Sequence, residues 1–389
     1  MIPGHVAAAI SALPRPVCAY VYDTAVLRAR AAAVRSALPD GSLLLYAVKA
    51  NGNPDVVAAL ASTVDGLEVA SGGELSLAVA ALAARPGLVV FGGPGKTDAE
   101  LAAAVDAGAV VNAESPLELR RLSTVAGRRT VAVTLRVNRP GPALPGSHHM
   151  TGVPTPFGID EARLPDAVAL AGNLPGLRLA GFGLHAVSNN LDAGAHAAYV
   201  HDAVRWSVAA GRRLGVPLEY VNVGGGFGVD YTGGARFDLA VFARGLASAA
   251  ADLPAGARLV FEPGRYLTAA AGWYAAEVLD LKRTHGRWFA VLRGGTHHFR
   301  LPAAWGYSHP CEVLPVDGWP YRYPRPEVRD TAVDVVGELC TPRDVLARAS
   351  AVDRLRVGDV LVFANAGGYG WDISHHDFLR HEHPRTVVL

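Results

Sequence analysis

The feature of this sequence that most limits its fold is a repeated alternation between short strand-like runs and longer helix-like segments. The alternation extends from about residue 36 to residue 265. Eight apolar or β-branched runs are predicted to be strands: Leu43–Val48, Gly66–Ala70, Leu88–Gly92, Val110–Glu114, Val131–Val137, Leu179–His185, Tyr220–Gly224 and Arg258–Gly264. Segments between most of them, such as Glu74–Ala84, have the apolar spacing of an amphipathic helix. Eight such units favour a closed, TIM-like (β/α)8 barrel, although an open doubly wound sheet would also alternate in this way.

The two ends of the chain have a different pattern, which predicts a second, β-rich domain. Residues 17–22 and the stretch after about residue 266 contain strand-like runs separated by Pro and Gly, with few long helical patterns. We therefore expect residues 36–265 to form the barrel. Residues 1–35 and 266–389 are expected to form an antiparallel β-barrel or sandwich assembled from both ends of the chain.

The composition argues against several classes of protein. Lys plus Arg (36) nearly balance Asp plus Glu (35), so no net field would attract nucleic acid or an anionic membrane. No run of 18 consecutive apolar residues is present, and the N-terminus lacks the basic start of a signal peptide. The three cysteines are too few and too scattered for a disulfide framework or a cysteine-based zinc site. A soluble cytoplasmic enzyme is expected.

The first and seventh predicted strands end in residues that suit chemistry, and active sites of such barrels lie at the C-terminal ends of the strands. Lys49 ends the first strand in YAVKAN, where partial desolvation would free its amine for imine formation. A surface lysine is the ordinary alternative. Glycines 224–226 end the seventh strand, and backbone N–H groups without side chains can bind a phosphate. A loop turn would equally explain the glycines.

The eighth strand ends in Glu262-Pro263-Gly264-Arg265. A carboxylate there can keep a pyridine nitrogen protonated, and an arginine can bind a phosphate or a carboxylate bidentately. A structural ion pair is the alternative. His185, after the sixth strand, would either pack in the core or stack on a cofactor ring. Together, a lysine, a glycine-lined phosphate site and an acid at three strand ends outline a site for pyridoxal 5′-phosphate (PLP).

With these motifs the sequence resembles the fold-type III PLP enzymes, in the branch of the ornithine, diaminopimelate and arginine decarboxylases. The motifs follow the family's order over nearly the whole chain: YAVKAN, HAVS (His185–Ser188), NVGGGFG, EPGR, LCTPRD (Leu339–Asp344) and GGYG (Gly367–Gly370). The resemblance implies an amino-acid decarboxylase with PLP as its cofactor. The family's usual HVGS and GAYG appear here as HAVS and GGYG, changes that would loosen the packing near the cofactor ring.

The resemblance also implies roles for individual residues. Lys49 would carry PLP as a Schiff base, His185 would stack on its ring, Glu262 would contact the pyridine nitrogen, and Arg136 would lie near the phenolic oxygen. Phosphate contacts are implied for Ser188, Gly225, Gly226 and Gly264, and further cofactor or substrate contacts for Arg265 and Tyr369.

The family builds its site across a head-to-tail dimer, so the resemblance implies a homodimer with shared active sites. Cys340, Asp344 and Tyr369 would then divide between the two subunits. The partner subunit's Cys340 would act as the general acid that returns a proton to the α-carbon of the substrate.

The residue after Cys340 departs from the family in a way that bears on the substrate. Ornithine and diaminopimelate relatives have an acid there, whereas this sequence has Thr341, and a buried ammonium without a partner is costly. Substrate contacts are expected from Thr341, Asp344 and Tyr369, and from Arg300 in a cationic rim. The HHFRLP segment and the His-rich tail are similar to decarboxylases of carboxylate-siderophore pathways, which act on amino acids condensed with citrate or a similar polyacid.

Several alternatives remain open from sequence. A decarboxylase of free diaminopimelate, ornithine or lysine, or of a carrier-protein-tethered amino acid, would share the motifs. An amino-acid racemase would lack the EPGR glutamate, and a non-catalytic PLP-binding protein would lack the second domain and Cys340. No metal is expected, because the histidines of the tail, 375–376 and 381–383, lack a recognised metal spacing.

Overall fold

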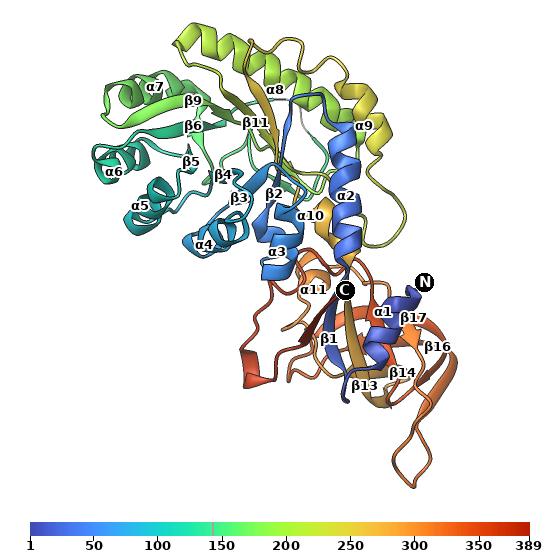
Figure 1. Cartoon of the computed structure of the whole chain (residues 1–389). Coiled ribbons are helices and arrows are strands. Elements are labelled where there is room, and N and C mark those ends of the chain that lie inside the picture. Colours follow the sequence, from blue (N-terminus) through green and yellow to red (C-terminus); the bar gives the residue numbers. More distant parts are fainter. Residues whose placement is uncertain (142–143) are drawn as a thin grey trace. The chain divides into compact units, whose positions relative to one another are not determined.

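The computed structural model describes residues 1–141 and 144–389, which fall into two compact units (Figure 1). The barrel unit comprises Arg28–Asp230 and Ala235–Leu267. The β unit comprises Met1–Leu27, Tyr231–Gly234 and Thr268–Leu389. The domain boundaries expected at residues 36 and 265 stay predictions.

The barrel unit contains a closed barrel of eight parallel strands. In the order in which they pair, these are β2 (Leu43–Ala47), β3 (Gly66–Val69), β4 (Leu88–Phe91), β5 (Val110–Ala113), β6 (Val131–Asn138), β9 (Leu177–Gly183), β11 (Tyr220–Gly224) and β12 (Arg258–Phe261). β12 closes the barrel onto β2, with Val260 opposite Leu43 and Phe261 opposite Leu44. The predicted TIM-like barrel is confirmed, and each of the eight predicted runs overlaps one strand.

Helices surround these strands (Figure 1). They are α2 (Thr24–Ala37), α3 (Pro54–Ala61), α4 (Gly72–Ala81), α5 (Asp98–Asp106), α6 (Pro116–Ala126), α7 (Leu164–Asn173), α8 (Ala193–Leu214), α9 (Leu239–Leu246) and the short α10 (Arg265–Thr268). Several begin where a side-chain oxygen accepts from backbone N–H groups of the first turn. Asn53 caps α3, Ser71 caps α4, and Thr97 forms a capping box with Glu100 at α5.

Side chains fill the barrel interior at one level. Leu45, Val90, Val110 and Val260 come from four different strands and pack together while almost completely buried. This is the layered packing expected inside a barrel of eight strands, which leaves no channel at that level. A ligand could therefore bind at the strand ends but not through this layer.

The connection between β6 and β9 carries extra short elements that the alternation did not predict. β7 (His148–His149) pairs antiparallel with β10 (Val187–Ser188), and β8 (Ile159–Asp160) extends the end of β6. These pairings hold the segment after β6 beside the HAVS motif.

The β unit is a mostly antiparallel sheet built from both ends of the chain, as predicted. Its strands are β1 (Cys18–Tyr22), β13 (Gly272–Thr284), β14 (Arg287–Leu292), β15 (Glu312–Leu314), β16 (Glu327–Val336), β17 (Val345–Arg356), β18 (Val360–Phe363) and β19 (Arg385–Val388). Two pairings, β14 with β16 and β1 with β19, are parallel. Helices α1 (Gly4–Ser11) and α11 (Leu301–Trp305) complete the unit, and α1 packs on β1, β13 and β18 through Val6 and Ile10.

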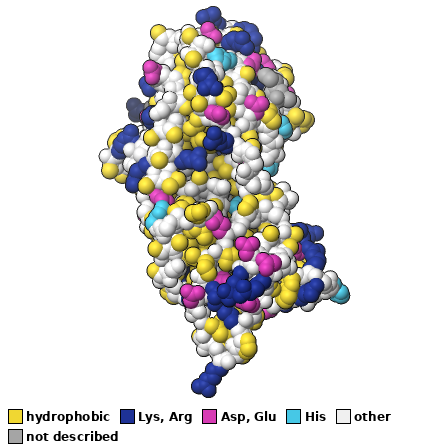
Figure 2. All heavy atoms as spheres, turned by 90° about the vertical axis from the view of Figure 1, so that its right-hand side faces the viewer, with side chains coloured by type: hydrophobic (Ala, Val, Ile, Leu, Met, Phe, Trp, Pro, Cys, Tyr) yellow, Lys and Arg dark blue, Asp and Glu magenta, His cyan; other side chains and the backbone are white. Residues whose placement is uncertain are grey.

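The surface agrees with the balanced composition. On the face drawn in Figure 2, acidic and basic side chains are interspersed. Within the described residues, no helix has both the length and the apolar character needed to cross a membrane.

The close pairing of β3 with β4 requires a glycine at position 66. A Cβ atom at Gly66 would lie 1.9 Å from the backbone oxygen of Leu88 in β4, the strand that pairs with it. Gly66→Ala should destabilise the protein by about 2–3 kcal/mol, because the backbone of β4 cannot rotate away as a side chain could. In urea unfolding, Gly172→Ala in α7 is the control: a Cβ there meets nothing within 4 Å, and the variant should gain up to about 1 kcal/mol. Equal stability of the two variants would contradict this account.

Candidate active site at the barrel mouth

The C-terminal ends of the barrel strands bring together the charged residues that the sequence indicated. Lys49 lies in a single 3-10 turn, Val48–Ala50, immediately after β2. Arg136 lies near the end of β6, and His185 and Glu262 follow β9 and β12. Electrostatic contacts connect these groups, since Lys49 and Arg136 both act on the pKa of His185 and on that of Glu262.

Lys49 forms an ion pair that sequence reasoning missed. Its Nζ donates to Oε2 of Glu68 at 2.5 Å, and the lysine side chain remains 42% exposed while that of Glu68 is 7% exposed. The Lys49 side chain is thus partly removed from solvent and also has a carboxylate partner, which the sequence did not indicate. Imine formation by this amine stays a prediction. Glu68 holds the amine at the mouth.

The other two lysines of the chain have different surroundings. Lys96 is buried, and its Nζ donates to the backbone oxygens of Gly93 and Asn112 and to Glu118 at 2.7 Å. Lys282 lies on β13 of the β unit and is 57% exposed. Of the three lysines, Lys49 is thus the one that follows a barrel strand with its side chain partly exposed.

Glu262 is a carboxyl group under strong electrostatic strain. Burial and the nearby carboxylate of Glu68 raise the pKa of Glu262 to about 7, against the opposing effects of Lys49, Asn222 and Arg136. Asn222 donates from Nδ2 to Oε1 of Glu262 at 2.5 Å. Perturbed acids of this kind are typical of functional sites, because a fold gains no stability from two buried like charges.

His185 is held neutral beside the glycine run. The Gly225 N–H donates to its Nδ1 at 3.3 Å, so that nitrogen is unprotonated and Nε2 carries the proton. Burial, with Arg136 and Lys49 nearby, lowers the pKa of His185 well below its usual range. The ring therefore offers a neutral aromatic plane at the mouth.

The glycines are required by close approach of the backbone. A Cβ atom at Gly224 would lie 2.3 Å from Nδ1 of His185, and one at Gly225 would lie 2.3 Å from the backbone oxygen of Glu262. Gly226 has a φ of +94° and would contact the backbone oxygen of Val187 at 2.5 Å. A Cβ at Gly264 would lie 2.8 Å from the Cβ of Ala50. Packing alone thus excludes side chains here, and phosphate binding stays a prediction.

Arg136 is fixed by Glu114, another acid that sequence reasoning missed. Nη1 of Arg136 donates to Oε1 of Glu114 at 2.8 Å, and the guanidinium lies 4.5 Å from the ring centre of Phe157. Glu114 also accepts from the backbone N–H of Gly93 and Gly158, at 2.9 Å each. The sequence contained a signal for both missed acids, because Glu68 and Glu114 interrupt or end otherwise apolar strand runs.

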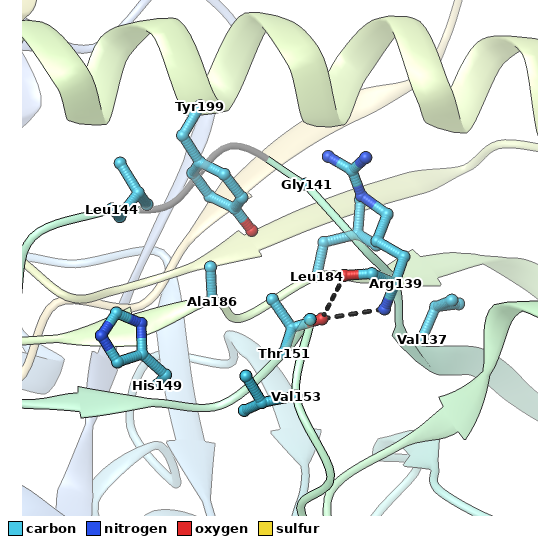
Figure 3. Close-up of a pocket in the computed structure, with 11 residues that line it drawn as sticks. Val137, Arg139, Gly141, Leu144, His149, Thr151, Val153, Leu184, Ala186 and Tyr199 are labelled. Atoms are coloured by element: carbon cyan, nitrogen blue, oxygen red, sulfur yellow. Dashed lines mark hydrogen bonds between the residues drawn. The ribbon is translucent and has the colours of Figure 1, made fainter.

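A small cavity of about 230 Å³ lies beside the mouth, between the ends of β6 and β9, helix α8 and the segment after β6 (Figure 3). Figure 3 shows Thr151 bonded to the backbone of Arg139, which it accepts from at 2.9 Å and donates to at 3.0 Å. Ala186 of the HAVS motif lines this cavity, and the looser packing expected near the cofactor ring stays a prediction.

The GGYG motif differs from that expectation. A Cβ atom at Gly368, where the family usually has Ala, would lie only 2.6 Å from Oγ1 of Thr268. The space that an alanine side chain would occupy at Gly368 is already taken by the Thr268 side chain. The looser packing predicted for this motif is therefore wrong. Tyr369 follows it with a φ of +56°.

The remaining predicted residues divide between the units. Ser188 in β10 and the buried Arg265 at the start of α10 belong to the barrel unit. Cys340 is exposed in the connection between β16 and β17, and Thr341 and Arg300 line one cavity of the β unit. Asp344, expected to contact substrate, is instead buried and accepts from the backbone N–H of Thr296 at 2.6 Å and of Leu339 at 2.8 Å. It holds the Cys340 segment in place.

Metal ligation has no geometric support in the part of the chain that the structure describes. There, no group of three or more His, Cys, Asp or Glu side chains is arranged to hold an ion.

Comparison with known proteins gives a consistent assignment. Residues 24–269 match the family model "Pyridoxal-dependent decarboxylase, pyridoxal binding domain". The chain is 39% identical to the 2-[(L-alanin-3-ylcarbamoyl)methyl]-2-hydroxybutanedioate decarboxylase of Staphylococcus aureus, over 98% of this chain and 96% of the relative. It is 31% identical to the L-glutamyl-[BtrI acyl-carrier protein] decarboxylase of Niallia circulans, over 95% and 88%. The solved diaminopimelate decarboxylase of Helicobacter pylori shares the fold, with a TM-score of 0.85 at 23% identity over 98% and 93%.

The raised pKa of Glu262 predicts a pH-dependent cost to the fold. Between the ordinary pKa of 4.5 and about 7, the folded state keeps a proton that the unfolded state has lost, so stability falls as pH rises through this window. Removing the charge should therefore stabilise the cofactor-free protein at pH 8. We expect Glu262→Gln to gain about 1–2 kcal/mol in urea unfolding at pH 8, and less at pH 5.

The matched control is Glu219→Gln in the same unit. Burial raises the pKa of Glu219, but its hydrogen bond and ion pair with Arg178 outweigh burial, and the pKa is lowered overall. The charged form of Glu219 is therefore favourable in the folded state, so Glu219→Gln should not gain stability at pH 8. Loss of stability by Glu262→Gln at pH 8 would contradict the strained carboxyl.

Proposed function

Because this chain belongs to the pyridoxal-dependent decarboxylases of fold type III, we propose that it removes CO2 from an amino acid whose far end carries a polycarboxylate. PLP is its cofactor, and Lys49 is the residue that holds it. The observation that carries the substrate class is Thr341, which lines the same cavity as Arg300. A hydroxyl in that place offers no charge to a distal ammonium.

The barrel mouth fits PLP. Lys49 supplies an amine that can reach the solvent, and Glu262 supplies a carboxyl group in an acidic environment beside Asn222. His185 offers a neutral ring, and the glycine run presents backbone N–H groups at positions too crowded for a side chain. When bound, PLP supplies the electron sink that accepts the pair left by departing CO2.

In this proposal the protein residues have distinct tasks. Glu262 would hold the pyridine nitrogen of the cofactor in its protonated form, because a positive charge there would offset the burial of Glu262 and its repulsion by Glu68. Glu68 positions Lys49 until the lysine is engaged by the cofactor, and Glu114 keeps Arg136 directed at the mouth. Ser188, Gly225, Gly226 and Gly264 would hold the phosphate, and Arg265 and Tyr369 would supply further contacts.

The polycarboxylate end is supported by the Staphylococcus relative. Its name describes an alanine joined through a carbamoyl-methyl group to a 2-hydroxybutanedioate, that is, an amino acid linked by an amide to a part with two carboxylates. A carrier-tethered substrate is the second candidate, supported by the Niallia relative. A free conjugate that is turned over without a carrier protein distinguishes the two.

The substrate class is tested by comparing kcat/KM for such a conjugate with kcat/KM for ornithine, lysine and diaminopimelate. The conjugate should be preferred by about 100-fold or more, because a buried charge without a partner costs several kcal/mol. CO2 release is the readout. Preference for any of the free diamino acids would contradict the proposed substrate class. Racemisation without CO2 release would contradict the decarboxylase activity itself.

The active form in this proposal is a homodimer with shared active sites. Cys340 is exposed, so it is free to act at the site of another subunit, where it returns a proton to the α-carbon of the product. Mixing inactive Lys49→Ala and Cys340→Ala subunits should restore about a quarter of the activity. Half of the dimers are then hybrids, and each hybrid has one site with both native residues. If native mass spectrometry shows subunit exchange and no activity returns, each site is built within one chain.

A further inference from the structure

The β unit contains a cavity of about 680 Å³ whose charged lining is entirely basic. Its polar lining includes Arg300, Arg343, Arg348, His375, Thr341 and Thr296. Within the described ranges, no Asp or Glu lines it. A volume of this size is typical of small-molecule sites.

A second cavity of the same unit shows that arginines alone do not make an anion site. It has about 670 Å³ and is also lined by three arginines, but Glu327, Asp330 and Asp334 line it too. Arg329 there donates to Glu327 at 2.9 Å. The charges of that second cavity are balanced by its own acids, whereas those of the first are not.

The arginines of the basic cavity are largely without carboxylate partners. Among residues 1–141 and 144–389, no carboxylate lies within 4 Å of Arg300 or Arg343. Arg348 lies 3.9 Å from Asp334, which also pairs with Arg287. Burial and the charge of Arg300 lower the pKa of His375, against the opposing effect of the buried Asp344 behind the cavity lining. Like charges held together in this way are costly unless an anion joins them.

The walls of the cavity are fixed by hydrogen bonds. The segment after α11 is joined to β17, because the N–H of His309 donates to the Leu346 oxygen at 3.0 Å and the N–H of Arg348 donates to Oγ of Ser308 at 2.9 Å. Thr341 Oγ1 accepts from the N–H of Arg343 at 3.3 Å. The hydroxyl proton of Thr341 is therefore left to donate. A site with fixed walls and several donors binds a branched anion with little loss of entropy.

We propose that this basic cavity binds the polycarboxylate part of the substrate, and that Arg343 and Arg348 determine specificity together with Arg300. The inference rests on the proposed function, since it assigns the place where that substrate's far end is recognised. Guanidinium groups suit carboxylates because each can form two parallel N–H···O bonds. Three guanidinium groups and the Thr341 hydroxyl match a group with two carboxylates and a hydroxyl.

The first arm of the test measures the binding of free citrate to the PLP-loaded protein by calorimetry. Arg343→Gln and Arg348→Gln should each weaken citrate binding by about ten-fold or more. Arg329→Gln, from the charge-balanced cavity, is the matched control and should leave the affinity unchanged. Equal affinity in wild type and in both cavity variants would overturn the proposal.

The second arm measures CO2 release from the conjugate and from 2,3-diaminopropionate, its unconjugated amino-acid part. We expect the two variants to raise KM for the conjugate about ten-fold without changing kcat/KM for 2,3-diaminopropionate, and citrate to compete with the conjugate. Normal KM in both variants would overturn the cavity assignment and leave the proposed function intact. Citrate inhibition that does not compete would make the cavity an effector site and overturn its role as a subsite. If citrate binding depends on Arg343 but no CO2 is released from the conjugate, the proposed substrate is wrong. The cavity is then an anion-binding site that is unrelated to that substrate.

Discussion

The closure of β12 onto β2 is the constraint on which the barrel mouth depends. It brings Glu262, near the end of the barrel sequence, to the same edge as Lys49, which lies near its start. The pairing of β2 with β3 adds Glu68 to that edge. These pairings therefore fix two carboxyl groups and one ammonium group at neighbouring strand ends.

This arrangement stores electrostatic energy that a purely structural site would avoid. Glu68 is satisfied by Lys49, but Glu262 accepts a hydrogen bond from the amide of Asn222 and has a pKa raised by burial and by Glu68. A cationic ring at this edge would relieve both effects. The neutral His185 and the glycine run leave a flat, uncharged wall beside it. The strain therefore has a functional explanation.

Much of this could be predicted from sequence, because the periodicity reports the strands and barrel geometry places function at their ends. Lys49, His185 and Glu262 were found in this way. Glu68, Glu114 and Asn222 were missed because, within a strand, the pattern does not show which neighbour a polar side chain will meet. The basic cavity was only partly anticipated, through Arg300 and Thr341. Arg348 enters it because the 300–309 segment packs on β17, a contact between segments distant in sequence.

The central claim is that Lys49 holds the cofactor at this edge, and the chain offers a direct test because it has only three lysines. Borohydride reduction of the PLP-loaded protein fixes the pyridoxyl group on the lysine that holds it, and peptide mapping locates the label. The account predicts the label on Lys49, and no label in Lys49→Ala. A label on the buried Lys96 or on Lys282 of the β unit would contradict it.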